Sequence, residues 1–288
     1  MPKKSAKSKR PQVRAPETSL SVATDPKKSV ADRVTAMAEV SMAICEDDQS
    51  FRAVINALRD PKEPFEVRNA ALQALGAAAF RVIEFAPCRS DYIATLRAVA
   101  EDPDPTLRRR ALGTLAREKD GYAQKKLIEG LKNPDAALVS PEKALQFLSS
   151  DPHSEAYAIA REVVKHPPND EAKAEALRLL AADPKSAPLF EKVLRDKDEL
   201  RDNRQIAASA LYSLNPGKFQ KHARAMLLDK SEFEDIQATS LTALAQFGDQ
   251  EAVGKDEPLL KGIQKLGAKT RSAKYKKNAR QFLARHGR

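Results

Sequence analysis

Residues that commonly carry chemistry are scarce in this sequence. Its 288 residues include four histidines and two cysteines, and they include no tryptophan. The sequence holds no HExxH, CxxC or GxSxG pattern, and it holds no GxxxxGK[ST] or GxGxxG loop that could cradle a phosphate. We therefore assign no catalytic, metal-binding or cofactor-binding residue from the sequence, and we expect a protein that is not an enzyme.

The two cysteines, Cys45 and Cys88, are too few for a disulfide framework, which is typical of a protein from a reducing compartment. Cys45 precedes three acidic residues, 46–48, which would raise the pKa of its thiol rather than activate it. No run of about 18 apolar residues could span a bilayer, and no apolar segment follows the basic start as it does in a secretory signal. We expect a cytoplasmic protein.

The positive charge of the chain is concentrated at its two ends. The net charge is +10, but residues 1–29 carry +6 and residues 255–288 carry +9, so the body between them is mildly acidic. Residues 1–29 also contain four prolines and few large apolar side chains. Such a segment cannot bury enough surface to offset the entropy of ordering it. We predict a disordered basic tail over residues 1–29.

Three roles stay open for this tail. The first is to keep the terminus soluble, the second is to serve as an arm for nucleic acid or an acidic partner, and the third is to act as a localisation signal. In the second role the phosphate-binding residues would be Lys3, Lys4, Lys7, Lys9 and Arg10.

A repeated Ala-Leu-x-x-Leu pattern is the strongest signal in the body of the chain. The final leucines of the copies recur every 30 to 40 residues, which is the period of solenoids built from helix pairs. Full copies begin at Ala71, Ala111, Ala144, Ala176 and Ala210, and degenerate copies begin at Ser240 and Ala279.

Each repeat reads as two helices. Apolar residues four positions before the pattern, such as Val67 and Leu107, place it on the buried face of the second helix. Asp-Pro and Asn-Pro pairs mark the turns, because the residue before a proline is driven out of the α conformation. The first helix begins with an aromatic residue that we expect in the core rather than on a base-stacking surface: Phe51, Tyr92, Tyr122, Tyr157, Phe190 and Phe219.

These patterns predict an all-α fold over residues 30–288. We expect a right-handed α-solenoid of about seven helix pairs, in which each repeat packs on its neighbours. A capping helix at about residues 30–45 would lead it, and a basic repeat at residues 255–288 would close it.

Segments 67–76 and 104–115 resemble HEAT repeats, and more narrowly the short HEAT-like repeats of bilin lyases. The resemblance extends over about residues 50–285 and implies that the second helices line a concave face. It also implies that a basic residue near the start of the second helix pairs with a nearby aspartate. That position is held here by Arg68, Arg108, Lys173 and Lys276.

Enzymes of similar architecture lack support in this sequence. Deoxyhypusine hydroxylases hold iron through His-Glu pairs, and no histidine here precedes a glutamate. The HEAT-like alkylpurine DNA glycosylases use tryptophan with a catalytic aspartate, and this chain has no tryptophan. Bilin lyase chemistry has no portable motif to test, so it stays open.

We therefore expect a scaffold that binds another protein along its concave face. The candidate contacts are Arg68, Arg108, Arg109, Arg110 and Lys173. The arginine triplet exceeds what a structural pairing needs, because three consecutive residues point in different directions around a helix.

The alternative is a nucleic-acid-associated protein that contacts phosphates through its basic tail and its C-terminal helix. A polar outer face on a terminal repeat also serves solubility alone. The candidate residues in the C-terminal helix are Lys274, Lys276, Lys277 and Arg280.

Overall fold

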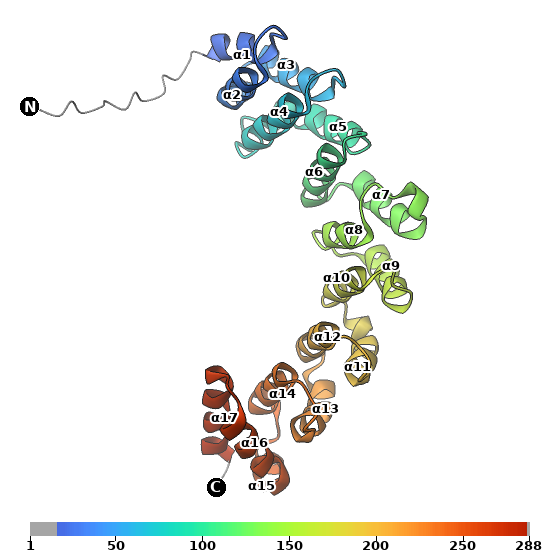
Figure 1. Ribbon diagram of the computed structural model, residues 1–288, viewed down its shortest axis with the longest axis vertical. Coiled ribbons are helices and arrows are strands. Elements are labelled where there is room, and N and C mark those ends of the chain that lie inside the picture. Colours follow the sequence, from blue (N-terminus) through green and yellow to red (C-terminus); the bar gives the residue numbers. More distant parts are fainter. Residues whose placement is uncertain (1–15, 287–288) are drawn as a thin grey trace, which may run out of the picture. The chain divides into compact units, whose positions relative to one another are not determined.

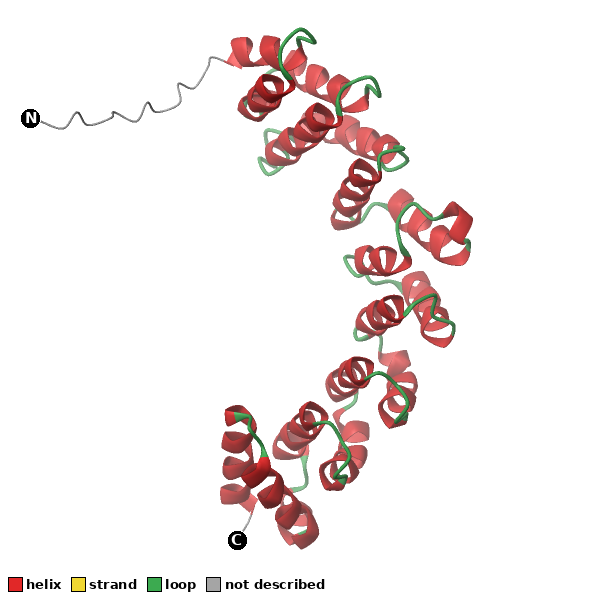
Figure 2. Ribbon diagram, in the orientation of Figure 1, coloured by secondary structure: helices red, strands yellow, loops and turns green. Residues whose placement is uncertain are grey.

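The computed structural model describes residues 16–286, apart from the side chains of residues 16–18, 247 and 274. Within that range every regular element is a helix and none is a strand, as Figure 2 shows. The prediction of an all-α fold is thereby confirmed.

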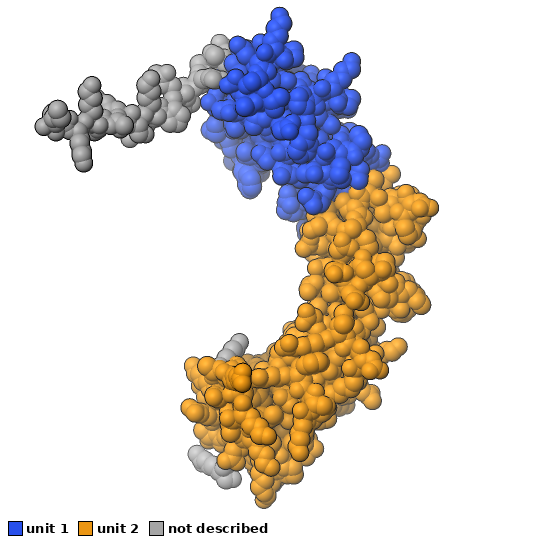
Figure 3. Space-filling view, in the orientation of Figure 1, with its two compact units in different colours: residues 1–123 blue, residues 124–288 orange. Residues whose placement is uncertain are grey.

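Two compact units divide the chain, residues 1–123 and residues 124–288 (Figure 3). The helices of the first unit are α1 (Pro16–Thr24), α2 (Val30–Val40), α3 (Asp48–Arg59), α4 (Phe65–Ala78), α5 (Arg89–Val99) and α6 (Pro105–Arg117). Helix α7 (Gly121–Lys132) begins just before the boundary.

The helices of the second unit are α8 (Pro141–Leu148), α9 (Ser154–Lys165), α10 (Asp170–Leu180), α11 (Ala187–Arg195), α12 (Arg201–Leu214), α13 (Pro216–Leu228), α14 (Glu234–Phe247), α15 (Gln250–Lys255), α16 (Glu257–Lys269) and α17 (Ala273–His286). Four single 3-10 turns lie between helices, at Ala43–Cys45, Ala86–Cys88, Pro134–Ala136 and Pro184–Ser186.

Side-chain caps and prolines start several helices. The carboxylate of Asp104 accepts hydrogen bonds from two backbone N–H groups at the start of α6, and Pro105 takes the first helical position. Asn215 and Pro216 start α13 in the same way. A proline is tolerated there because the first helical N–H has no partner inside the helix.

Consecutive helices pack as pairs in the first unit. Helix α1 packs on α2, α3 on α4 and α5 on α6, and the second helices α2 and α4 also touch. Phe85 lies at the centre of an aromatic cluster, with its ring centroid 6.2 Å from that of Phe51 and 5.3 Å from that of Tyr92. All three rings are buried and meet edge to face, so Phe51 and Tyr92 are core residues as predicted.

The second unit repeats this arrangement. Helices α9, α11 and α13 each pack on the helix that follows, and α8, α10, α12 and α14 pack one on the next (Figure 1). Phe190 and Phe219 are fully buried between these layers, as predicted. The core prediction is wrong for Tyr122 and Tyr157, which are half-buried because their hydroxyl groups donate to Glu101 and to the Ala182 carbonyl.

The described helices give the predicted number of pairs. From α3 onward first and second helices alternate along the chain in seven pairs, with α15 as a short addition before the last pair. Six of these pairs are in close packing contact, and α7 with α8 takes the place of the remaining pair by chain order. The predicted capping helix is α2, which is itself the second helix of a pair with α1.

Helix α1 lies inside the stretch 1–29 that the sequence predicts to be disordered, so that prediction is wrong for residues 16–24. Ser19 and Ala23 are fully buried, and the Ser19 hydroxyl donates to the Glu39 carboxylate at 2.7 Å. The small size of these side chains allows α1 to approach α2, which offsets the cost of ordering a segment with few large apolar residues. Residues 1–15 lie outside the described range.

The packing of α1 predicts a strong effect of Ala23→Asp. A carboxylate would be buried there without a partner, so the free energy of unfolding should fall by about 3 kcal/mol or more. Thr24→Asp is the matched control, because Thr24 is exposed, and its effect should stay within about 0.5 kcal/mol. Urea unfolding of both variants measures the difference, and equal stabilities would show that α1 does not pack as described.

Candidate partner-binding surface

A basic residue occupies the fourth position of six second helices, two of which are α6 with Arg108 and α17 with Lys276. The other four are Arg33 in α2, Arg68 in α4, Lys173 in α10 and Arg204 in α12, and we call these four residues the cation row. A fully buried alanine follows each of them three residues later.

Each of the three arginines in the cation row hydrogen-bonds to the C-terminal end of the first helix that precedes it. In each case the Nε–H donates to the carbonyl oxygen of the penultimate residue of that helix. Such a carbonyl has no partner within its own helix, because the last four of a helix are unpaired. The three bonds are Arg33 to Ala23 at 3.0 Å, Arg68 to Leu58 at 2.9 Å and Arg204 to Leu194 at 3.0 Å.

Each member of the cation row also pairs with a carboxylate in the following repeat. The carboxylate lies in the loop between the next first helix and the next second helix, so the pair joins neighbouring repeats. The pairs are Arg33 with Glu63 at 2.7 Å, Arg68 with Asp102, Lys173 with Glu199 at 2.5 Å and Arg204 with Glu232 at 2.7 Å.

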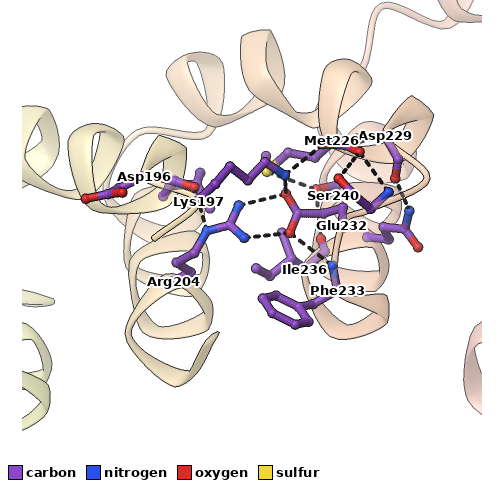
Figure 4. A network of polar contacts seen from close by, with 12 residues as sticks. Asp196, Lys197, Arg204, Met226, Asp229, Glu232, Phe233, Ile236 and Ser240 are labelled. Atoms are coloured by element: carbon purple, nitrogen blue, oxygen red, sulfur yellow. Dashed lines mark hydrogen bonds and ion pairs between the residues drawn. The ribbon is translucent and has the colours of Figure 1, made fainter. Parts of the chain in front are cut away.

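Figure 4 shows the most buried of these junctions, between α12 and α14. The side chains of Arg204 and Glu232 are 2% and 1% exposed, and two parallel hydrogen bonds of 2.9 and 2.7 Å join them. Lys197 donates to Glu232 at 2.9 Å and to Asp229 at 2.7 Å. Such a two-pronged guanidinium–carboxylate contact is among the stronger hydrogen-bonded pairs in proteins.

The carboxylates at this junction are held in the charged form. Burial by itself would raise the pKa of Glu232, but hydrogen bonds from Arg204 and Lys197 outweigh it and hold this pKa below its usual range. Hydrogen bonds from Lys197 and Ser231 lower the pKa of Asp229. The junction therefore loses its ion pairs only in acid.

Two predicted partner contacts are thereby corrected. Arg68 is buried in its pair with Asp102, and Lys173 is half-buried against Glu199, so neither offers its charge to a partner. Both instead have the pairing role that the HEAT resemblance implies. Arg108 is also half-buried, and its Nη1 donates to the Asp102 carbonyl at 2.8 Å.

The sequence reasoning missed Arg33 and Arg204. Arg33 lies beside a segment that was predicted to be disordered, and in α12 the Ala-Leu pattern begins one turn late, at Ala210. A basic residue followed three positions later by alanine is the signal that finds both, since it is shared by the whole cation row.

Arg109 and Arg110 are exposed on α6 and make no ion pair within the described part of the chain. They differ in this from Arg68, which is paired with Asp102. Of the five predicted partner contacts, these two are positioned to meet another molecule.

A groove of about 420 Å³ crosses the second helices α8, α10 and α12. Five carboxylates and two basic side chains line it, together with Leu200, which is 48% exposed. Asp170, Glu171 and Asp202 are exposed and make no ion pair among the described residues. The groove therefore offers an acidic surface with one apolar contact point.

The loop between α4 and α5 exposes large apolar side chains. Phe80 is 88% exposed, Val82 is 68% exposed and Ile83 is 85% exposed. The loop is anchored, because Arg81 donates to the Met42 carbonyl at 3.2 Å and Phe85 is buried in the aromatic cluster. Grouped exposed apolar side chains are typical of protein contact sites.

The basic C-terminal residues are partly available. Lys277 and Arg280 are exposed on α17, and Lys276 is half-buried. The side chain of Lys274 lies outside the described residues. The same holds for all of the tail candidates, Lys3, Lys4, Lys7, Lys9 and Arg10.

The described residues show little reactive chemistry. Burial raises the pKa of both cysteine thiols, Cys45 and Cys88. At Cys45, burial raises the thiol pKa more than the neighbouring acidic residues do. Residues 16–286 contain no group of three or more His, Cys, Asp or Glu side chains arranged to hold a metal ion. Across the described helices, none has the length and apolarity needed to cross a membrane.

The α12–α14 junction predicts unequal effects at its two cations. Arg204→Met leaves Glu232 buried beside only one cation, so the free energy of unfolding should fall by about 3 kcal/mol. Lys197→Met is the matched control, since the Lys197 side chain is 49% exposed, and should cost about 1 kcal/mol or less. Urea unfolding tests both, and equal losses would contradict the assignment of Arg204 as the central residue.

The lowered pKa of Glu232 predicts how acid acts on the fold. A carboxylate whose folded pKa is depressed contributes stability above its unfolded pKa, about 4.3 for glutamate, and loses it as pH falls through the folded value. The variant Glu232→Gln cannot titrate there. It should be less stable than the parent at pH 7, and its melting temperature should fall less steeply below about pH 4. Melting curves at several pH values measure this, and parallel slopes would contradict it.

Part of the chain matches a known family, and the whole chain has distant likenesses among solved structures. The family model described as HEAT repeats matches residues 51–146. Among solved structures, the chain is similar to one from the complex of CpcE and CpcF of phycocyanin lyase from Nostoc sp. PCC7120, with 18% identity and a TM-score of 0.43, covering 93% of this chain and 99% of that chain.

Human deoxyhypusine hydroxylase in complex with glycerol is also similar, with 17% identity and a TM-score of 0.35, covering 86% of this chain and 99% of that chain. No curated protein matches the sequence. The prediction of HEAT repeats from segments 67–76 and 104–115 is confirmed by the family match, which includes both segments. The similarity to HEAT repeats is thus shown for residues 51–146, one third of the chain.

Proposed function

We propose that this chain is a non-enzymatic scaffold that binds another protein along the surface of its second helices. The observation that carries the proposal is the groove across α8, α10 and α12. It spans three successive repeats, as a binding surface of stacked helix pairs does. Its volume of about 420 Å³ is enough to seat several side chains of a partner.

The charge of this groove favours protein over nucleic acid as its occupant. Asp170, Glu171 and Asp202 would repel a phosphate backbone, and they would attract a basic segment of a protein. Leu200 adds an apolar contact of the kind that the centre of a protein interface buries.

The anchored loop of α4 and α5 supports the same class of function in the first unit. Leaving Phe80, Val82 and Ile83 in water is unfavourable by about 25 cal/mol for each Å² that a partner would cover. Because a neighbouring backbone and a buried ring hold the loop, a partner would not have to order it, and this lowers the cost of binding.

Nucleic-acid binding through the basic ends is the second candidate. Lys277 and Arg280 favour it, because they are exposed and have no carboxylate partner among the described residues. Phosphate contacts of this kind give affinity that falls steeply with salt, whereas a protein groove depends on salt much less.

The groove predicts which surface charges matter for a partner. Proteins captured from a cell lysate by the parent chain should include one whose capture falls at least tenfold with Glu171→Lys/Asp202→Lys. The double variant Glu155→Lys/Glu162→Lys on first helix α9 makes the same charge change at exposed positions and should capture that protein as the parent does. Quantitative mass spectrometry of the captured proteins measures this, and identical profiles for all three chains would refute the proposal.

A titration of labelled duplex DNA at several salt concentrations tests the second candidate alongside. We expect no binding at about 0.15 M salt. Binding there, with a salt slope that corresponds to several phosphates and that falls with Lys277→Glu/Arg280→Glu, would replace the scaffold proposal with the nucleic-acid one.

A further inference from the structure

We propose that a second groove, between α13 and α16, binds an acidic amphipathic helix of a partner protein. This groove has a volume of about 480 Å³ and lies apart from the groove across α8, α10 and α12. Its floor and its rim differ in chemistry, and the two together specify the occupant.

The floor is apolar. Leu227 and Leu228 at the end of α13 face Pro258 and Leu266 of α16 across it. Gly262 lets the two helices approach closely, because a Cβ atom at that position would lie 2.8 Å from Cδ2 of Leu228. The floor is therefore formed by leucine side chains in close contact with a helix backbone, and it suits the apolar face of a helix.

The rim is basic and linear. Lys261, Lys265 and Lys269 follow one another at every fourth residue of α16, so they form one row with steps of about 6 Å along the helix. Lys230 adds a fourth ammonium group from the loop after α13. All four side chains are exposed.

The carboxylates at the groove do not neutralise this row. Asp229 already accepts from Lys197 at 2.7 Å, and Glu257 accepts from Lys261 at 3.0 Å. Lys230, Lys265 and Lys269 make no ion pair within residues 16–286. The groove thus has basic charge to offer to a ligand.

This geometry selects among anionic ligands. A row of ammonium groups at helical spacing matches a row of carboxylates at helical spacing, whereas a single anionic headgroup would use one or two of them. A flat lipid surface cannot reach a concave floor, and a phosphate backbone gains nothing from apolar contact. An amphipathic helix uses both features, with its leucines on the floor and its glutamates along the lysines.

The partner proposed for this groove has the opposite charge to the partner proposed for the groove across α8, α10 and α12. The groove across α8, α10 and α12 suits a basic segment, and the groove between α13 and α16 suits an acidic one. The two proposals therefore stand or fall separately, because charge changes at one groove leave the other unaltered.

The test is the binding of a labelled synthetic peptide to the full chain, followed by fluorescence polarisation. The peptide has about four helical turns, with leucines at the spacing of one helix face and glutamates beside them. We expect saturable binding that weakens at least tenfold with Lys265→Glu/Lys269→Glu and is retained with Lys265→Arg/Lys269→Arg. The matched control Lys192→Glu/Lys221→Glu makes the same charge change at exposed lysines of α11 and α13 and should bind as the parent does.

Two further measurements separate the apolar and the charged contributions. A peptide with its leucines replaced by serine should lose binding at least tenfold, since it cannot use the floor. Gly262→Leu should also weaken binding of the original peptide, and its circular dichroism and melting curve establish whether the variant is folded. If it is not folded, the lysine variants decide the question.

Several results would overturn the proposal. Absence of peptide binding would do so, as would equal binding by the parent and by Lys265→Glu/Lys269→Glu. Tighter binding of phosphatidylserine vesicles or of duplex DNA through the same lysines would assign the groove to a membrane or a nucleic acid instead. Loss of peptide binding by the control variant would show that the net charge of the chain, and not the groove, determines peptide binding.

Discussion

The pairing of a buried cation with a helix end and with the next repeat is the interaction on which this structure depends. An α-helix ends with carbonyl groups that lack partners, and a solenoid of short helices has many such ends. Arg33, Arg68 and Arg204 each donate a hydrogen bond to one of these carbonyls. Each guanidinium group also pairs with a carboxylate of the neighbouring repeat. One side chain therefore both ends a helix and orients the loop of the following pair.

Where the cation row is interrupted, weaker contacts take its place. The fourth residue of α8 is Ala144, and the loop before α10 meets α8 through Asn169, whose amide donates to Glu142 at 3.5 Å. In α14 the position is held by Gln237, which donates to the Asp229 carbonyl at 2.9 Å but carries no charge. A repeat thus tolerates a neutral residue at this place when apolar packing between second helices is extensive.

The sequence determines the fold more directly than the surfaces. The Ala-Leu pattern locates the second helices because a periodic apolar face is a local property, and the buried leucines Leu75, Leu112 and Leu180 follow from it. The same pattern places the basic residue of the cation row near the start of a helix. It does not reveal that Arg68 is buried, because burial depends on the position of Asp102, which lies 34 residues away.

The two grooves could not be predicted for the same reason. The first is formed by three helices that lie about one repeat apart, and the second depends on the close approach that Gly262 allows. The order of α1 also depends on contacts beyond its own composition, since its burial comes from small side chains that fit against α2. A short stretch of sequence indicates the conformational preference of its own residues. The grooves and the order of α1 arise instead from packing between stretches that lie apart in the sequence.

The exposed apolar loop after α4 has a consequence for the behaviour of the chain in solution. Two copies at high concentration can bury Phe80, Val82 and Ile83 against each other. The electrostatic repulsion between molecules that each carry a net charge of +10 opposes this association. That repulsion is screened within about 10 Å at 0.1 M salt, whereas apolar attraction is not. Added salt would therefore favour self-association of the chain, and a partner that covered the loop, as proposed above, would oppose it.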